Sequence, residues 1–396
     1  MMQKSSAPPA GDVDWQLLAP LLAHVVVTHV VVGILRVTMS YRTVELGLPA
    51  IWLGAIAAGF AILPIFVALR IGRYIDRGHD AHAAWIGSGL MLLAALGLWM
   101  WPLSAIHLLV FSMVLGTGHM FLMASQQMLT VRCANPRGRD VAFGHFMVAI
   151  SIGQGLGPFI VGSVGGGATV PATGPLFLLG VMAAALCLAI SFGIRPAPRA
   201  AAHEESGNVI TLPELLRRPG MLAVLIASVV TVTAGDLLVI YLPLLGTERN
   251  IDAHHIGMLL LVRSLSALVA RIFYARLIYA VGRMPLTLSS TFLAAGAFVL
   301  LAVPSLPIMY AATVLIGVGL GIASTLTLSG IVEVAPPSAR ATAMSLRITG
   351  NRIGLVFMPF VAGLVAAAAG VAGILLLTAI SLATTAVAMQ RSRPSG

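Results

Sequence analysis

Residues 50–69 read AIWLGAIAAGFAILPIFVAL, an apolar run without a charged side chain. An α-helix needs about 20 such residues to cross the roughly 30 Å hydrocarbon core of a bilayer. A helix satisfies its backbone hydrogen bonds within the segment, whereas a β-barrel would show short segments of alternating polarity. The run therefore predicts a membrane-spanning helix.

Similar runs recur along the whole chain of 396 residues, of which 59% are hydrophobic and only 9% are charged. This composition excludes a soluble globular domain and predicts an all-α membrane protein. Twelve transmembrane helices are expected, at residues 16–44, 50–70, 82–101, 105–131, 140–164, 174–194, 220–246, 255–279, 284–303, 307–332, 341–367 and 371–390.

The net charge of +10 is distributed as a topology signal and not as a nucleic-acid-binding surface. If the N-terminus is cytoplasmic, most of the 23 lysine and arginine residues fall at cytoplasmic ends of the expected spans. Only Arg42 and Arg249 fall on the external side of the membrane. Cytoplasmic loops carry such an excess of positive charge. We expect an integral protein of a bacterial-type cytoplasmic (inner) membrane, with both termini in the cytoplasm.

A polar stretch divides the chain into two halves. Residues 195–220 read RPAPRAAAHEESGNVITLPELLRRPG. A shift of 201 residues places Gly153 and Pro158 on Gly354 and Pro359. Parallel repeats of this kind are typical of transporters whose solute site lies between the halves. We expect a six-helix bundle in residues 1–194, a cytoplasmic linker in 195–219 and a second six-helix bundle in 220–396.

The loop after the second span carries GRYIDRGHD, residues 72–80. It resembles the Gly-x-x-x-Asp-Arg signature of the major facilitator superfamily of secondary transporters, with Gly72, Asp76 and Arg77 in place. The Gly-Arg-Arg that follows in the family is disturbed, and Asp80 stands where a base is usual. The resemblance implies two pseudo-symmetric six-helix bundles that rock around a central site.

The corresponding loop of the second half, ARLIYAVGRM at residues 275–284, keeps Gly282 and Arg283 but has Tyr279 in place of the acid. In the family, the acidic residue of the loop after the second span docks on the N-terminal end of a neighbouring helix and closes the cytoplasmic side in one state. The resemblance therefore implies that Asp76 and Arg77 form such a latch. The alternative is that Arg77 only anchors the topology.

The fifth span carries GQGLGPFIVG, residues 153–162, which is similar to a glycine-proline motif common among exporters of the family. Glycine allows close approach of helices and proline bends them, so this span could be a moving seam; tight packing alone is the alternative. The gating residues expected are Gly72, Asp76, Arg77, Gly157, Pro158 and Arg347.

Charged side chains lie inside the expected spans, where each costs at least roughly 2.5–3.5 kcal/mol and so suggests a function. Arg352 lies about 18 Å from the cytoplasmic edge, near the midplane, and Arg347 about 10 Å. Arg352 is therefore assigned to a central cavity, with a structural ion pair as the alternative. Arg36 lies in the first span, and the surrounding sequence leaves open whether it reaches the cavity or the interface.

Asp236 is the only acid well inside the membrane. It lies at about 14–15 Å depth, as does Arg263 on the next span. The two could pair as a structural bridge. Alternatively, a lone Asp236 carboxylate in a low dielectric has a raised pKa and could serve as a proton carrier. The expected substrate- and ion-binding residues are Arg36, Asp236, Arg263, Arg352, Gln154, His29, His145 and Asn351. For the histidines, a neutral hydrogen-bonded role in the core is the commoner alternative.

The sequence shows no nucleotide-binding loop, metal-ligand spacing or nucleophile arrangement, so we expect no enzyme activity, no cofactor and no metal. The first reading is proton-coupled export (antiport) of a metabolite or drug. However, SMVLGTG has Ser112 where proton-coupled exporters of the family carry an arginine. The alternatives are proton-coupled uptake of an organic anion, and an assembly or sensor protein without transport. The expected partners are a small-molecule substrate, protons and the lipid bilayer, but no nucleic acid, and the protein is expected to be a monomer.

Overall fold

The computed structural model describes residues 12–100, 104–135, 137–194, 212–336 and 339–391, which are almost entirely helical. The helices are α1 (Trp15–Glu45), α2 (Ala50–Asp76), α3 (Asp80–Met100), α4 (Ala105–Arg132), α5 (Arg139–Gly165), α6 (Thr173–Phe192), α7 (Leu212–Leu216), α8 (Met221–Glu248), α9 (Ala253–Ile272), α10 (Tyr274–Val281), α11 (Arg283–Leu301), α12 (Leu306–Val334) and α13 (Arg340–Arg391).

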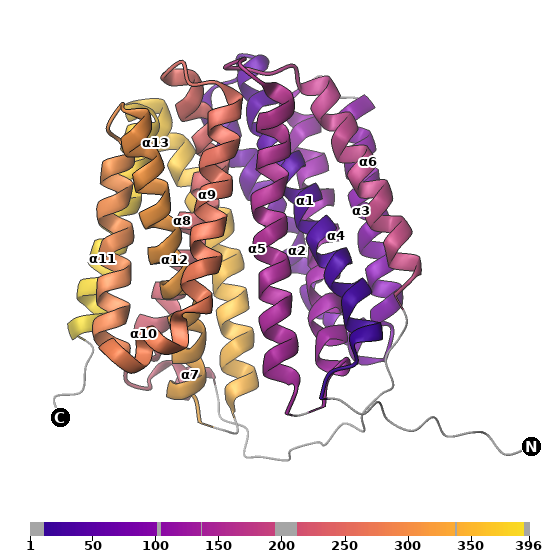
Figure 1. Cartoon of the computed structure of the whole chain (residues 1–396), viewed down its shortest axis with the longest axis vertical. Coiled ribbons are helices and arrows are strands. Elements are labelled where there is room, and N and C mark those ends of the chain that lie inside the picture. Colours follow the sequence, from indigo (N-terminus) through magenta and orange to yellow (C-terminus); the bar gives the residue numbers. More distant parts are fainter. Residues whose placement is uncertain (1–11, 101–103, 136, 195–211, 337–338, 392–396) are drawn as a thin grey trace, which may run out of the picture.

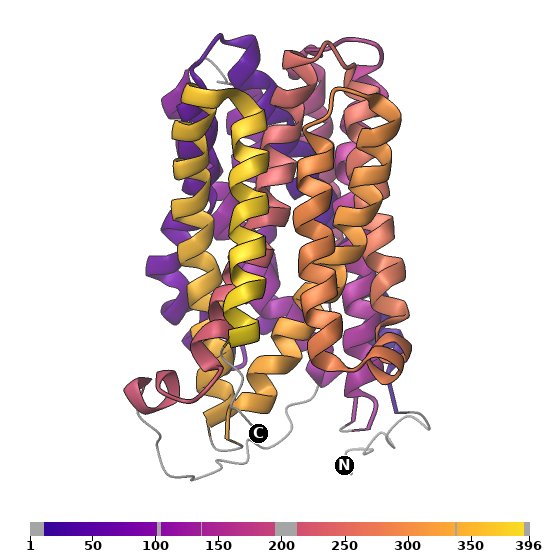
Figure 2. The ribbon, with the colours of Figure 1, turned by 90° about the vertical axis from the view of Figure 1, so that its left-hand side faces the viewer.

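The expectation of an all-α membrane protein is confirmed. Eleven of the described helices are long and apolar enough to span a membrane. The longest, α13, contains a break at Gly370, whose φ of 64° is not helical. In Figure 2 the chain turns back at the upper end of this yellow segment, so α13 supplies two of the twelve expected spans.

The expected span at residues 255–279 is too long. Helix α9 ends at Ile272, and a separate short helix, α10, begins at Tyr274. The 20 residues of α9 already suffice to cross the hydrocarbon core. The side chain of Tyr279 in α10 is 93% exposed, and Figure 1 shows α10 turned across the lower end of the molecule.

The helices of the first half, α1 to α6, occupy one side of the molecule, and α8 to α13 occupy the other (Figure 1). Between them, α2 packs against α13 and α5 packs against α9. The start of α1 and the end of α13 lie at the same end of the helices, which we call the terminal face; the other end is the opposite face (Figures 1 and 2). Most of the expected linker, 195–211, lies outside the described residues, so the domain boundaries stay a prediction.

At the opposite face, helices of the two halves are in backbone contact. A Cβ atom added to Gly54 of α2 would strike the carbonyl oxygen of Pro359 in α13, which also accepts a 2.9 Å hydrogen bond from the Tyr241 hydroxyl. The amide of Ala253, at the start of α9, donates to the carbonyl of Ala168 beyond α5 at 2.8 Å. These contacts close the opposite face.

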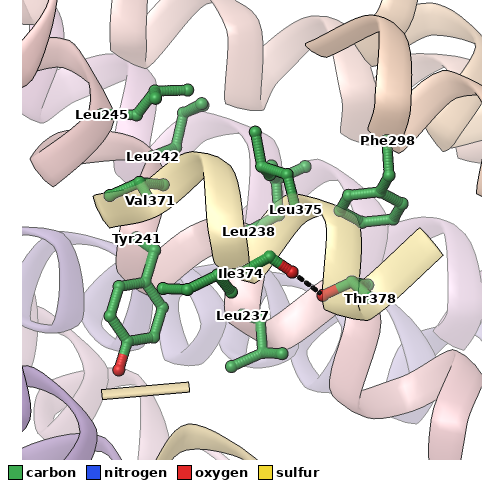
Figure 3. A pocket seen from close by; sticks show the side chains of 10 residues that line it. All are labelled: Leu237, Leu238, Tyr241, Leu242, Leu245, Phe298, Val371, Ile374, Leu375 and Thr378. Atoms are coloured by element: carbon green, nitrogen blue, oxygen red, sulfur yellow. Dashed lines mark hydrogen bonds between the residues drawn. The ribbon is translucent and has the colours of Figure 1, made fainter. Parts of the chain in front are cut away.

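Next to these backbone contacts, α8 and the last part of α13 pack against each other through apolar side chains. Figure 3 shows Leu237, Leu238 and Leu242 of α8 facing Ile374 and Leu375 of α13. The gap among them is about 10 Å³, no more than one water would fill. This contact is packing and leaves no room for a solute.

Both cysteines are free and buried. Cys187 lies 3.4 Å from Nε2 of His24, in a buried polar cluster that joins α1, α3, α4 and α6. Cys133 follows the last turn of α4, where burial, and then the nearby Asp14 carboxylate, raise the pKa of its thiol to about 11. Little reactive thiolate is present at neutral pH, as for a packing residue.

Candidate functional site

A cavity of about 500 Å³ lies between the two halves, within the range of about 300–1,000 Å³ typical of small-molecule sites. Helices α1, α2, α4 and α5 line one side, and α8, α9, α12 and α13 line the other. The polar residues of its wall are His29, Arg36, His119, Gln127, Ser151, Gln154, Thr231, Asp236, Arg263, Ser264, Arg271, Ser324, Arg347, Asn351 and Arg352.

The cavity runs from the middle of the bundle toward the terminal face. Its wall includes Gln127, five residues before the end of α4, and Arg271, one residue before the end of α9. It also includes Arg347, in the second turn of α13. All three positions lie in the parts of their helices nearer the terminal face. The cavity lining therefore reaches closer to the terminal face than to the opposite face.

The carboxylate of Asp236 on α8 is held by Arg36 on α1. Nη1 and Nη2 of Arg36 donate to Oδ1 and Oδ2 of Asp236 at 2.5 and 2.8 Å, and the two side chains are only 10% and 16% exposed. The expected Asp236–Arg263 pair is therefore wrong. An interfacial Arg36 is also wrong, because α1 continues nine residues past it, or about 14 Å. The pair links the two halves across the cavity wall.

The other four arginines of the wall form no ion pair with a described carboxylate. Arg271 donates to Oγ of Ser151 at 2.8 Å, and Nη2 of Arg352 lies 3.4 Å from Sδ of Met120; both contacts cross between the halves. The Nε atoms of Arg263 and Arg347 are buried without a hydrogen-bond partner. Nη2 of Arg263 donates to Oγ of the adjacent Ser264 at 3.3 Å. A buried cation that no carboxylate neutralises is costly, so these side chains are suited to an anion from outside the chain.

Three of the remaining expected binding residues line the cavity, and one does not. His29 and Gln154 line the cavity, as does Asn351, whose Oδ1 accepts a 3.1 Å hydrogen bond from Ser228. His145 does not: it is exposed near the terminal end of α5, with its ring 5.1 Å from that of Trp15. The placement of His145 among the binding residues is wrong, because α5 begins only six residues earlier.

Two titratable residues of the wall, Arg271 and His119, were missed from the sequence. Arg271 lies eight positions after Arg263 on α9, close to the same helix face, so its spacing could have indicated it. His119 lies four and eight positions before Met123 and Gln127, which also line the cavity. A four-residue spacing places side chains on one face of a helix.

Among the expected gating residues, Gly157 and Pro158 pack closely against Gly33 of α1. Arg347 lines the cavity. Arg77 caps the end of α2 and is exposed, and Gly72 has open space around it. The side chain of Asp76 lies outside the described part of the chain. The gating roles stay predictions.

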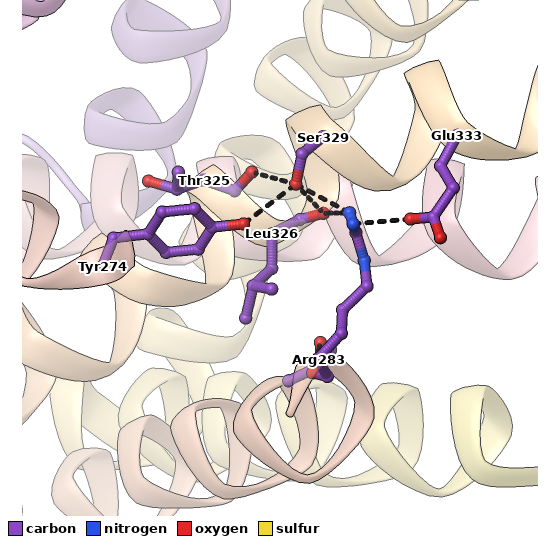
Figure 4. Close-up of polar contacts among 7 residues, drawn as sticks. Tyr274, Arg283, Thr325, Leu326, Ser329 and Glu333 are labelled. Atoms are coloured by element: carbon purple, nitrogen blue, oxygen red, sulfur yellow. Dashed lines mark hydrogen bonds and ion pairs between the residues drawn. The ribbon is translucent and has the colours of Figure 1, made fainter. Parts of the chain in front are cut away.

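Ion pairs of opposite polarity lie at equivalent places in the two halves. At the terminal face, Asp80 at the start of α3 pairs with Arg132 at the end of α4. A shift of 201 residues places Arg132 at the position of Glu333, which pairs with Arg283 at the start of α11. Figure 4 shows this second pair, with Ser329 accepting a 2.7 Å hydrogen bond from Arg283. Asp80, a departure from the family pattern, thus has a structural partner.

Removing one partner is expected to affect these two ion pairs unequally. Asp80 is fully buried, so Arg132→Ala leaves an unpaired buried carboxylate, which costs about 3–5 kcal/mol. The side chain of Glu333 is 62% exposed, and exposed pairs contribute about 0–1 kcal/mol. Thermal unfolding in detergent should therefore show a clear loss for Arg132→Ala and almost none for Glu333→Ala. Equal losses would contradict this account.

Comparisons with known proteins agree with the geometry. The sequence model of the Major Facilitator Superfamily matches residues 21–250 and 224–395. A mutant of the nucleoside transporter NupG has a similar structure, with a TM-score of 0.80 at 14% identity over 96% of this chain and 100% of that one. No curated protein sequence matches.

Two other solved transporters share the fold. A POT family transporter in complex with 5-aminolevulinic acid has a TM-score of 0.76 at 13% identity, over 94% of this chain and 95% of that one. A bacterial homologue of the human lysosomal transporter Spinster, inward-facing and occupied, has a TM-score of 0.73 at 14% identity, over 97% of both chains. At such identities the likeness concerns the fold alone.

Proposed function

The chain belongs to the major facilitator superfamily of secondary transporters, and we propose that it carries a small organic anion with two or more negative charges by alternating access. The observation behind the proposal is the charge of the cavity wall, where five arginines face one carboxylate. Unit charges 4 Å apart interact by about 4 kcal/mol at an effective dielectric constant of about 20. An anion would relieve the repulsion among these cations, whereas a cationic solute would increase it.

The distribution of contacts supports alternating access. One end of the cavity is closed by close helix packing between the halves, and the lining extends toward the other. Because most basic residues lie toward the terminal face, we propose that this face is cytoplasmic and that the protein is inward-open here. Opening at the other face would require α2 to leave α13 and α5 to leave α9.

Proton-coupled uptake of the anion is a better explanation of the site than antiport of a drug. Both carboxylate oxygens of Asp236 are occupied by hydrogen bonds from Arg36. At the position where exporters of the family carry an arginine, Ser112 donates to the carbonyl of Ile56 at 2.6 Å. Neither side chain then serves an exporter-type proton exchange.

Counterflow in reconstituted vesicles would test the proposal. Vesicles loaded with unlabelled succinate, citrate or glycerol 3-phosphate should accumulate the same labelled compound, while tetraethylammonium and glucose should not exchange. Arg352→Ala removes charge-assisted hydrogen bonds of about 1.5–3 kcal/mol, so exchange should fall by about 10- to 100-fold.

Arg276→Ala is the matched control, because Arg276 is exposed on α10 and lies outside the cavity wall. It should leave exchange unchanged. Exchange of the cation, or an Arg352→Ala variant as active as the wild type, would exclude this assignment of the site.

A further inference from the structure

Two histidines meet in the cavity wall. The rings of His29 on α1 and His119 on α4 lie edge to face, with their centroids 5.5 Å apart. Nδ1 of His29 is hydrogen-bonded to the carbonyl of Val25 at 2.9 Å. Both ring nitrogens of His119 are buried and have no hydrogen-bond partner.

His24, a packing histidine in the same bundle, has hydrogen-bond partners for both ring nitrogens. One of its ring nitrogens lies 3.1 Å from Oγ of Ser88, and the other lies 3.0 Å from Nε2 of Gln126. Buried polar groups in native proteins are almost always hydrogen-bonded in this way. His119 departs from that rule and lines the cavity, which His24 does not. A role in packing does not explain a histidine there.

The histidine pair adjoins the cationic side chains of the site. The ring of Phe60 on α2 lies 5.4 Å from that of His119, and the guanidinium carbon of Arg36 lies 4.6 Å from the centre of the Phe60 ring. Arg352 of α13 contacts Met120, the next residue after His119.

The charged and titratable side chains beside His119 are His29 and Arg36 from α1 and Arg352 from α13. Helix α2 contributes the uncharged Phe60, and α8 contributes Asp236, whose carboxylate is occupied by Arg36. Among the described residues, α3 and α5 contribute no charged side chain to the cavity wall.

We propose that His119, positioned by His29, binds the proton that is transported together with the anion. The proposal rests on the proposed function. With the cavity empty, Arg36 and Arg352 oppose a further positive charge on the imidazole. When an anion neutralises these arginines, the lone pair of one ring nitrogen takes a proton from solution, and it releases the proton when the anion leaves. Because such coupling is reciprocal, the proton also strengthens anion binding.

Proton uptake by purified protein tests this directly. Succinate, citrate or glycerol 3-phosphate, adjusted to the same pH, is added to protein in weakly buffered detergent solution with a pH-sensitive dye. The wild type should take up about one proton for each anion bound. His119→Gln should bind the anion and take up at least about tenfold fewer protons. Proton uptake equal to that of the wild type would overturn the proposal.

Transport separates coupling from anion movement. In vesicles with a pH gradient, His119→Gln and His29→Gln should lose gradient-driven accumulation of the anion but keep counterflow at equal pH and saturating anion concentration within about threefold. His145→Gln is the matched control, because it makes the same change in the same half at an exposed position outside the cavity wall. It should retain both activities.

The outcomes distinguish this proposal from the proposed function. Counterflow without gradient-driven accumulation in the wild type would reject proton coupling and leave anion transport intact. Loss of coupling in Asp236→Asn, but not in the histidine variants, would make Asp236 the carrier. Absence of counterflow for all three anions in the wild type would reject anion transport and this inference with it. Loss of counterflow in a monodisperse, folded His119→Gln would give the histidine a role in anion binding instead.

Discussion

Arg36→Ala is expected to nearly abolish anion exchange and to lower the unfolding temperature, whereas Arg36→Ala combined with Asp236→Ala recovers the stability but not the exchange. The single variant leaves the Asp236 carboxylate unpaired inside the cavity wall, and breaking a buried pair in this way costs about 3–5 kcal/mol. The double variant removes both charges and therefore this penalty. Exchange should fall by about 100-fold in both variants, because each lacks a cation for the solute.

Counterflow and thermal unfolding in detergent measure the two effects separately. Arg276→Ala is the matched control: it also removes an arginine, but one that is exposed on α10 and lies outside the cavity wall. It should change both quantities little. Exchange at the wild-type rate in Arg36→Ala would place Arg36 outside the solute path. A double variant no more stable than the single one would show that the ion pair is not the cause of the lost stability.

Gly54→Ala is expected to open the opposite face. The added methyl group would overlap the backbone carbonyl of Pro359, which cannot turn aside as a flexible side chain could, so α2 must move away from α13. Overpacking of this kind costs about 1–3 kcal/mol, enough to shift a two-state equilibrium by about 5- to 100-fold. Because the contact exists only in the state closed at this face, the variant should populate the other state.

Labelling of a cysteine placed at Ala57, one turn further into the membrane on α2, measures the shift. Ala57 is buried, so a membrane-impermeant maleimide should react slowly with Ala57→Cys alone and at least about tenfold faster when Gly54→Ala is added. Gly89→Ala serves as the control, since no atom lies within 4 Å of the added methyl group there. An unchanged labelling rate in Gly54→Ala would show that this contact does not hold the face closed.

The helices could be predicted because each satisfies a local requirement. A run of about 20 apolar residues meets the needs of lipid and of its own backbone without reference to any other segment. The exception is the predicted span 255–279, where α9 ends at Ile272. The apolar residues of α10 continue the run in the sequence, and only the structure shows the turn between the two helices.

The candidate site was predictable in part. A charge inside a span is visible in the sequence, and so is its depth, since the rise per residue of a helix is constant. Arg352, Arg263 and Asp236 were singled out in this way, and all three line the cavity. His145 does not line the cavity, because it lies only six residues from the start of α5.

The sequence by itself determined which segments cross the membrane and which charges lie within them, because both depend on properties repeated along one chain segment. Only the tertiary structure decided that Asp236 pairs with Arg36, 200 positions away. It also decided that the ring of His119 packs against that of His29 while both ring nitrogens of His119 lack a hydrogen-bond partner. Those contacts depend on how each helix is rotated and tilted against its neighbours. Rotation and tilt are set by packing between helices, which no single segment encodes.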